Sequence, residues 1–250
     1  MSLLSCDSLT KNFDGVEALS GFSCAVKEGE IVGLIGPNGA GKTTLFNVLT
    51  GFIVADGGQA SFQGKKITGK PPYQLARMGI TRTFQILRLI KRLTVLDNAL
   101  ICFQNQPGER LGNIFFRWRL SARQEAANRE EAIALLQQYG LGDKLHDLAD
   151  ALSYGQQKLL SMICCLSASA NLILLDEPVA GIAPEMIEKI LDVIKGLPAQ
   201  GKTVILIEHN MDAISRVCDR VIFMDAGAKV CEGSVDDVRN DPRVIEAYLD

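Results

Sequence analysis

A glycine-rich octapeptide is the segment of this sequence with the clearest chemistry. It matches the pattern G-x-x-x-x-G-K-[ST], whose glycines let backbone N–H groups wrap closely around a phosphate. The lysine of that pattern reaches the β- and γ-phosphates of a nucleotide, and the last hydroxyl ligates Mg²⁺. The alternative is a glycine-rich turn with a chance lysine, but the strand-like run before it and the helical pattern from Thr44 to Leu49 favour a phosphate loop. The predicted phosphate contacts are Gly36, Pro37, Asn38, Gly39, Ala40, Gly41, Lys42, Thr43 and Thr44.

Two adjacent carboxylates, Asp176 and Glu177, follow a second short apolar run. Because neighbouring residues of a strand point to opposite sides, the two acids can serve different purposes. We predict that Asp176 holds Mg²⁺, directly or through water, and that Glu177 polarises the attacking water as a general base. By itself an Asp-Glu pair before Pro178 is more often a surface turn, and the phosphate loop upstream is what favours the catalytic interpretation.

His209 follows a third apolar run at a matching level of the expected sheet. From there its side chain could contact the γ-phosphate and the water. A single histidine is more often structural or merely exposed, and only its position favours a role for His209. The second histidine, His146, lies in a polar helical segment, and we assign it no function.

The three apolar runs that precede these residues set the expected fold. Each is short, rich in Ile, Leu and Val, and followed at once by polar residues or glycine, as expected for strands buried in a parallel sheet. Ligands of such sheets bind at the carboxyl ends of the strands. The runs are Ile31–Ile35, Leu172–Leu175 and Val204–Ile207. Antiparallel strands are expected over residues 3–30 and 56–68, and a hairpin over Val221–Asp225 and Lys229–Glu232.

A helical pattern runs from about residue 72 to 168. Within it, residues 121–139 carry an apolar stripe among charges, which we assign to Ala126, Ala127, Ile133, Ala134, Leu135 and Leu136. The fold class expected is therefore α/β: a P-loop NTPase core with a mixed, mostly parallel sheet and an antiparallel β subdomain, plus an inserted helical subdomain. We expect one domain, 1–250, with the helical subdomain at 72–168 inside it.

Composition limits the cellular setting. The net charge is −3, so the basic footprint of a nucleic-acid-binding protein is missing. Seven cysteines without a C-x-x-C pair argue against a disulfide framework or a zinc site and fit a reducing cytosol. No secretory signal is visible at the N-terminus. The apolar runs are far shorter than the ~20 residues of a membrane-spanning helix, so any link to a membrane must go through a partner.

One further motif separates the many proteins with a phosphate loop. The segment Leu152–Gln157, with Ser153, Gly155 and Gln156, resembles the signature motif of ABC ATPases, in which a serine and backbone N–H groups at a helix start bind a phosphate. Ser153 and Gln156 also form the pattern of a capping box, and both interpretations can hold together. The resemblance covers essentially the whole chain.

The resemblance to ABC ATPases implies roles for further residues. Phe13 is similar to the aromatic residue that stacks on adenine, and Gln85 to the glutamine that senses Mg²⁺ and water. Ala180–Pro184 corresponds to the D-loop, and Glu208 with His209 to the H-loop. The chain departs from the family pattern twice: Tyr154 replaces a signature glycine, which puts that contact in doubt, and Phe13 lacks the hydroxyl of the commoner tyrosine, which should change little.

In that family two ATPase domains pair head to tail, and each ATP lies between one phosphate loop and the other domain's signature. The resemblance thus implies a second ATPase subunit, identical or not, ATP and Mg²⁺ as ligands, and integral membrane permease subunits. It places the chain in the cytoplasm, peripheral on the inner face of the cell membrane. We expect neither nucleic acid nor transported solute to bind it directly.

A narrower resemblance is to LivG-type ATPases of branched-chain amino acid importers. It rests on residues 33–47, 76–85, about 104–125 and 241–249. ATP-driven closure of the dimer would power the permease and import branched-chain or other amino acids. The expected permease surface follows Gln85 and comprises Ile86, Leu87, Arg88, Leu89, Ile90, Lys91, Arg92 and Leu93; an ordinary amphipathic turn is the equal alternative for any one of them.

Four other functions remain as alternatives at this point. Within transport they are an ATPase for urea or amide import and a lipopolysaccharide-type exporter; the Arg82–Gln85 segment favours the amino acid importer over the exporter. A soluble ABC ATPase of translation or DNA repair would usually carry two fused domains or basic segments. A small-molecule kinase with a phosphate loop would not explain residues Ser153–Gln156.

Overall fold

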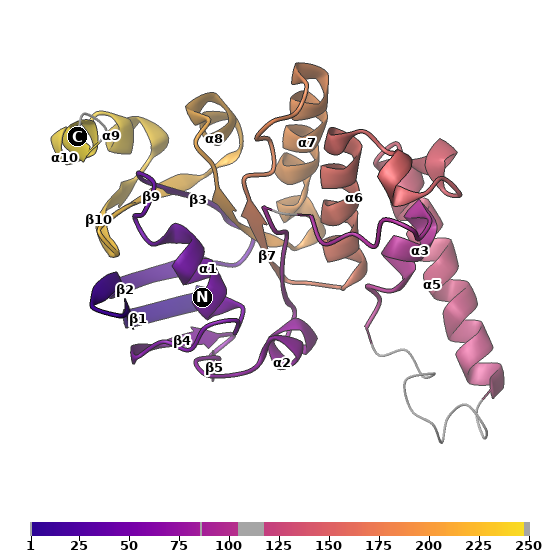
Figure 1. The fold of residues 1–250 in the computed structure, drawn as a ribbon, viewed down its shortest axis with the longest axis horizontal. Coiled ribbons are helices and arrows are strands. Elements are labelled where there is room, and N and C mark those ends of the chain that lie inside the picture. The colour runs from indigo at the N-terminus through magenta and orange to yellow at the C-terminus, as the bar shows by residue number, and fades with distance from the viewer. Residues whose placement is uncertain (1, 86, 105–117, 248–250) are drawn as a thin grey trace. The chain divides into compact units, whose positions relative to one another are not determined.

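The computed structural model describes residues 2–85, 87–104 and 118–247 (Figure 1). These residues form two compact units. The first comprises Met1–Gln85, Asn171–Ala180 and Ile187–Asp250, and the second Ile86–Ala170 and Gly181–Met186. Among the described residues, no helix is long and apolar enough to cross a membrane.

A six-stranded sheet organises the first unit. Its strand order is β10-β9-β3-β8-β7-β6, and all neighbours run parallel except β10, which pairs antiparallel with β9. Every residue of the three strands built from the apolar runs is buried. The strands are β3 (Ile31–Ile35), β6 (Ile80–Arg82), β7 (Leu172–Asp176), β8 (Thr203–Ile207), β9 (Arg220–Asp225) and β10 (Ala228–Gly233).

A second, antiparallel sheet belongs to the same unit, in the order β2-β1-β4-β5. Its core residues join those of helix α1 and of the large sheet in one apolar cluster, so α1 is buried between the two sheets. The mixed sheet and the antiparallel subdomain expected from the sequence are thereby confirmed. The elements are β1 (Ser2–Phe13), β2 (Val16–Lys27), β4 (Gly57–Phe62), β5 (Lys65–Lys66), and helices α1 (Lys42–Leu49) and α2 (Pro72–Arg77).

Three helices cover the end of the large sheet near β9 and β10 (Figure 1). They are α8 (Met211–Val217), α9 (Val235–Arg239) and α10 (Pro242–Ala247). Ile214, Val238 and Val244 from these helices pack with Phe223 of β9 in a second apolar cluster. This packing holds the loops after β8 and β9 to the sheet that carries the phosphate loop.

The second unit consists mainly of helices α3 (Val95–Leu100), α5 (Trp118–Gln138) and α6 (Tyr154–Ser167), which contact one another. Helix α7 (Pro184–Gly196) begins in this unit and ends in the first. The expected stripe on α5 is wrong in part: Ala126, Ala127 and Ala134 are exposed, and Ile133 and Leu135 are half-buried. Leu136 is buried as expected, together with Asn128 and Ala132, which the expected stripe did not include. Spacing by four residues decides the buried face, and alanine is too weakly apolar to mark it.

The range 72–168, where the sequence pattern is helical, also contains β6 at the edge of the large sheet. Three residues are too few for a periodic signal, so a strand this short escapes a pattern search. Short turns of 3₁₀-helix occur at Gly142–Lys144, Ala149–Ala151 and Pro198–Gln200.

Candidate nucleotide site

The phosphate loop connects β3 to α1, as the sequence indicates. Its backbone needs glycine at two positions for close packing: a Cβ would lie 2.0 Å from the Met224 carbonyl oxygen at Gly36, and 2.3 Å from the Ala18 carbonyl oxygen at Gly41. Gly39 differs, because its φ is +85° but nothing lies within 4 Å of the position of a Cβ. The loop is thus held on its outer side and open at Gly39, as a phosphate cradle requires.

The ammonium of Lys42 lies inside this loop. Its Nζ donates hydrogen bonds of 2.8 Å to the carbonyl oxygens of Gly36 and Pro37. Burial lowers the pKa of Lys42, and the nearby carboxylates of Glu177 and Asp176 act in the opposite direction. A buried cation beside a loop of backbone donors is suited to bind a polyphosphate.

A cavity of about 330 Å³ lies against the loop. It brings together most of the residues predicted to contact the nucleotide, and two that were not predicted, Ala18 and Ile207. Gly36 and Pro37 do not line the cavity. Their carbonyl oxygens instead accept the hydrogen bonds from Lys42 Nζ. The lining residues are Ala18, Asn38, Gly39, Ala40, Gly41, Lys42, Thr43, Thr44, Gln85, Glu177, Ile207 and His209.

Glu177 brings a carboxylate into this cavity from the residue after β7. Its Oε2 accepts a hydrogen bond of 3.2 Å from Gln85 Nε2, and its Oε1 lies 3.3 Å from His209 Nε2. The backbone of Glu177 has φ of +49°, a left-handed conformation that costs a non-glycine residue about 1–2 kcal/mol. Strain of this kind is found where a side chain must be aimed at a site.

Asp176 is the last residue of β7, and its carboxylate is close enough to Lys42 to act on the pKa of that lysine. Asp176 is absent from the cavity lining, and its Oδ2 accepts a hydrogen bond of 2.8 Å from Arg82 Nη2. Burial raises the pKa of Asp176, while the guanidinium of Arg82 acts to lower it. The sequence analysis missed Arg82 as a partner of this acid, because 94 positions separate the two residues.

Glu208 is a second residue whose part was missed. Its side chain is buried, and Oε1 accepts a hydrogen bond of 2.9 Å from the Val179 N–H. Oε2 accepts from the N–H groups of His209 and Asn210, at 3.0 and 3.3 Å. The Glu208 carboxylate thereby links the loop after β7 to the loop after β8. It also fixes the position of the His209 backbone at the end of β8. A sequence signal for this role existed, because Glu208 directly precedes His209 at the end of a strand.

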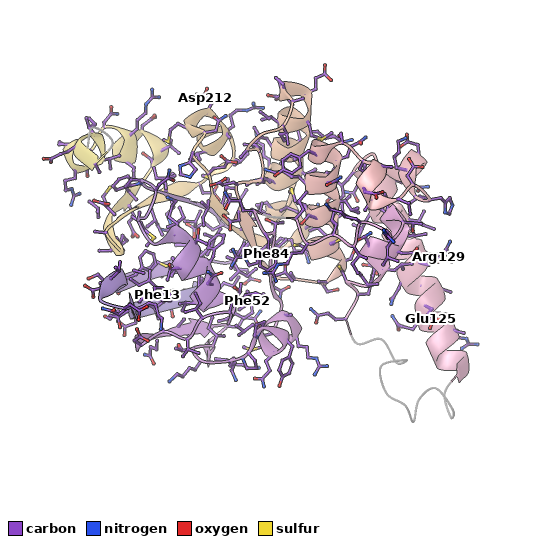
Figure 2. The ribbon with its side chains drawn as sticks, in the orientation of Figure 1. Phe13, Phe52, Phe84, Glu125, Arg129 and Asp212 are labelled. Carbon is purple, nitrogen blue, oxygen red and sulfur yellow. The ribbon has the colours of Figure 1, made fainter. Side chains whose placement is uncertain are left out.

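Phe13 lies at the end of β1 and is half-exposed (Figure 2). It is absent from the residues that line the cavity, and the Nζ of Lys11 lies 5.3 Å from its ring centroid. A stacking contact with adenine therefore remains a prediction.

The predicted signature residues belong to the second unit. Ser153 is the N-cap of α6, its Oγ accepts from the Gln156 N–H at 3.3 Å, and Gln156 Oε1 accepts from the Ser153 N–H at 2.9 Å. The capping box is therefore present. Gly155 is buried, and a Cβ there would lie 2.6 Å from Met186 Cγ, so packing explains this glycine without a ligand.

A phosphate loop between a buried strand and a helix, facing a carboxylate at the end of another parallel strand of the same sheet, defines a P-loop nucleotide hydrolase. Comparison with known proteins narrows the class. The ABC transporter profile matches residues 19–180, and the C-terminal profile of branched-chain amino acid ATP-binding cassette transporters matches residues 228–249.

A probable branched-chain amino acid transport ATP-binding protein, LivG of Archaeoglobus fulgidus, is 38% identical over 100% of this chain and 96% of its own length. A solved ADP conformation of an ABC transporter cassette superposes with a TM-score of 0.86, at 36% identity, covering 100% and 99% of the two chains. A dimeric post-hydrolysis cassette bound to ADP and Pi gives 0.76 at 25%, covering 93% and 98%. The chain belongs to the ABC transporter ATP-binding family, whose members are ATPases coupled to transport.

Proposed function

We propose that this chain hydrolyses Mg·ATP in the cavity beside the phosphate loop, with Glu177 as the general base. One observation carries the proposal: the Glu177 carboxylate reaches that cavity and is held between Gln85 Nε2 and His209 Nε2, at 3.2 and 3.3 Å. A base fixed at both oxygens can accept a proton only from a water that lies within hydrogen-bond distance of it inside the cavity. Gln85 and His209 orient that base, and His209 also faces the γ-phosphate.

Binding of ATP falls to the loop and its neighbours. The N–H groups from Asn38 to Thr44 hold the phosphates, Lys42 supplies charge to the β- and γ-phosphates, and Phe13 stacks on adenine. Thr43, Asp176 and Gln85 would hold Mg²⁺, which would supply positive charge to the β- and γ-phosphate oxygens. The open space at Gly39 and the position of Thr43 and Gln85 in the same cavity support this assignment.

The second half of the site comes from another ATPase subunit. Ser153, Gly155 and Gln156 of the partner would face the γ-phosphate, and the partner's phosphate loop would face the same residues of this chain. A relative that forms a dimer bound to ADP and Pi supports this arrangement. Closure of the dimer on ATP, and its release after hydrolysis, then drives the permease.

Permease subunits would contact the segment that follows Gln85. Ile90, Arg88, Lys91 and Arg92 are exposed there, and Ile86 lies outside the described residues. The buried side chain of Asn98 organises the segment, because it binds the backbone of Ile90 at both N–H and C=O, at 2.9 and 3.1 Å. A loop held by Asn98, with basic side chains interleaved among apolar ones, suits a partner that brings an amphipathic helix.

The transported solute is a branched-chain or other amino acid, and the subunit works on the inner face of the cell membrane. Support comes from the relative named as a probable branched-chain amino acid transport ATP-binding protein, which matches over the full length of this chain, and from the C-terminal match at 228–249. Co-purification of this chain in mild detergent, followed by identification of the membrane protein recovered, tests the partner. Recovery of ribosomes or DNA in place of a permease would overturn it.

The Glu177→Gln variant tests the catalytic proposal. It keeps the shape and the contact with Gln85, so ATP binding should stay within a few-fold of wild type while hydrolysis falls about 100-fold or more. ATP should also shift the variant to a dimer in light scattering. Normal turnover in Glu177→Gln would remove this residue from its role.

A further inference from the structure

Arg82 occupies an unusual position at the end of β6. Its side chain is 5% exposed and forms an ion pair with Asp176, whose side chain is also 5% exposed. The Nη2–Oδ2 distance is 2.8 Å, and Nη1 donates to Asn47 Oδ1 on α1 at 2.7 Å. A single guanidinium thus joins three elements that surround the cavity: β6, β7 and α1.

Aromatic rings pack on this guanidinium. Its central carbon lies 4.6 Å from the ring centroid of Phe84 and 5.5 Å from that of Phe46. Phe84 in turn meets Phe52 edge to face, with centroids 5.6 Å apart (Figure 2). Rings on its faces and acceptors at its edge leave a planar cation little freedom to turn.

The backbone between Arg82 and Gln85 is tied to the same strand as Asp176. Thr83 N–H donates to the Leu174 carbonyl at 2.9 Å, and Thr83 Oγ1 accepts from the Asp176 N–H at 3.1 Å. Gln85 follows only two residues later, where its amide reaches Glu177. The position of Gln85 therefore depends on where Arg82 and Thr83 attach to β7.

We propose that Arg82 is a positioning residue for ATP hydrolysis: it orients the Asp176 carboxylate and fixes the start of the segment that delivers Gln85 to Glu177. The proposal rests on the function proposed above for Asp176, Glu177 and Gln85. Arg82 itself touches neither nucleotide nor water in this role. Its effect passes through one ion pair and three residues of backbone.

Lysine cannot replace arginine at this position without loss. An ammonium has one nitrogen, so it could reach Asp176 or Asn47 but not span both with fixed geometry. Arg82→Lys keeps the charge that pairs with the buried Asp176 and so is the variant with the better prospect of folding. Arg82→Met removes the charge and leaves that carboxylate without its cation.

The chain offers a matched control. Arg216 also forms a forked pair, with Nη1 donating to Glu188 Oε1 at 2.7 Å, but both side chains are exposed and neither lines the cavity. Such a surface pair contributes little to stability. Arg216→Lys makes the same chemical change as Arg82→Lys without touching the site.

The experiment measures kcat, KM for ATP, the Mg²⁺ concentration for half-maximal activity, the affinity for a fluorescent ATP analogue with and without Mg²⁺, and the folded fraction by circular dichroism. For Arg82→Lys we expect analogue affinity without Mg²⁺ unchanged, kcat lower by about tenfold and the Mg²⁺ requirement higher by about tenfold, as for other residues that orient metal ligands. Arg82→Met should show the same pattern more strongly, and Arg216→Lys should match wild type.

Two results would overturn the proposal. One is an Arg82→Lys protein with wild-type kcat and Mg²⁺ requirement; the other is a loss of activity that disappears once rates are divided by the folded fraction, which a purely structural role gives. Glu177→Gln separates this inference from the function on which it rests. If Glu177→Gln is inactive and Arg82→Lys is normal, only the role of Arg82 fails; if Glu177→Gln turns over normally, the assigned function fails first.

Discussion

Two helix starts, one in each unit, carry glycine motifs that we propose bind phosphate, yet their geometry is opposite. Helix α1 begins after Gly41, which has φ of 94°, and among the described residues no side chain caps it. Helix α6 begins after Ser153, which has φ of −61° and closes a capping box with Gln156. The first N–H groups of α1 are therefore presented to the cavity, whereas α6 satisfies one of its own.

This difference in capping explains why the phosphate loop gives stronger structural support for a bound phosphate than the Ser153 motif does. An uncapped helix start beside an open left-handed glycine leaves N–H groups available to an anion in the cavity. A capped start already has one of its N–H groups satisfied within the chain, so it gives less indication of a ligand. If Ser153 Oγ contacts a nucleotide, it must either give up the hydrogen bond that it accepts from the Gln156 N–H or make the new contact beside it.

Replacement of Gly39 by alanine should give the largest effect on this comparison. The new methyl would meet no protein atom, but it would project where the phosphate is expected, so ATP affinity should fall by about tenfold or more. Gly201→Ala is the control: φ there is +73°, space is open, and the residue is outside the cavity lining. Both should lose roughly 1–2 kcal/mol of stability from backbone strain. Calorimetry measures the ATP affinity of both variants. Equal affinity would show that the phosphate does not lie against Gly39.

Gly155→Ala should mainly destabilise the second unit. The new Cβ would lie 2.6 Å from Met186 Cγ, and overpacking of this kind costs about 1–3 kcal/mol. Binding of ATP by the isolated subunit should stay at the wild-type level, because the cavity belongs to the first unit. Hydrogen exchange of α6 measures the change. The double variant with Met186→Ala should recover part of the loss, and a failure to recover any would show that packing is not the reason for glycine.

Ser153→Ala and Ser234→Ala form a pair that separates capping from phosphate binding. Each serine closes a capping box, Ser153 with Gln156 on α6 and Ser234 with Asp237 on α9. Each variant should lose about 1 kcal/mol of stability in urea unfolding. Only Ser153→Ala should also lower ATPase activity. Wild-type ATPase activity in both variants would show that Ser153 acts only as a helix cap.

The smallest effect concerns a fourth helix start, at α10. Hydrogen bonds from the Arg243 side chain, and then from its N–H, lower the pKa of Asp241 to about 2. A depressed pKa means that the contact stabilises the folded chain above the ordinary pKa near 4 and that this stability is lost as pH falls toward about 2. Carboxyl titration by NMR should find the low midpoint in wild type and an ordinary one in Arg243→Ala. A wild-type midpoint near 4 would contradict the contact.

Much of the fold could be predicted from the sequence, because a strand that is buried on both faces appears as a continuous apolar run. Ile31–Ile35 and Val204–Ile207 were bounded to within a residue for this reason. Strand β6 was not found, since Ile80–Arg82 is short and ends in a charge. That charge is buried only because Asp176 meets it from another strand, and a pairing across 94 positions leaves no local pattern.

The candidate site divides in the same way. Lys42, Glu177 and His209 each come after a strand that the sequence reveals, Lys42 at the end of the loop that follows β3, so their convergence in one cavity could be expected. The partners that hold them could not: Gly36 and Pro37 accept from Lys42, and Glu208 fixes the loop of His209. These contacts depend on backbone direction, which residue type alone does not determine.

The left-handed backbone of Glu177 restricts how the enzyme can be disabled for study. A β-branched substitute would add steric conflict at this φ, and alanine would remove the side chain that both neighbours grip. Either change alters shape together with chemistry, so a slow enzyme made that way would not reveal which was lost. An amide of equal length is therefore the substitution best suited to trap the loaded complex for imaging.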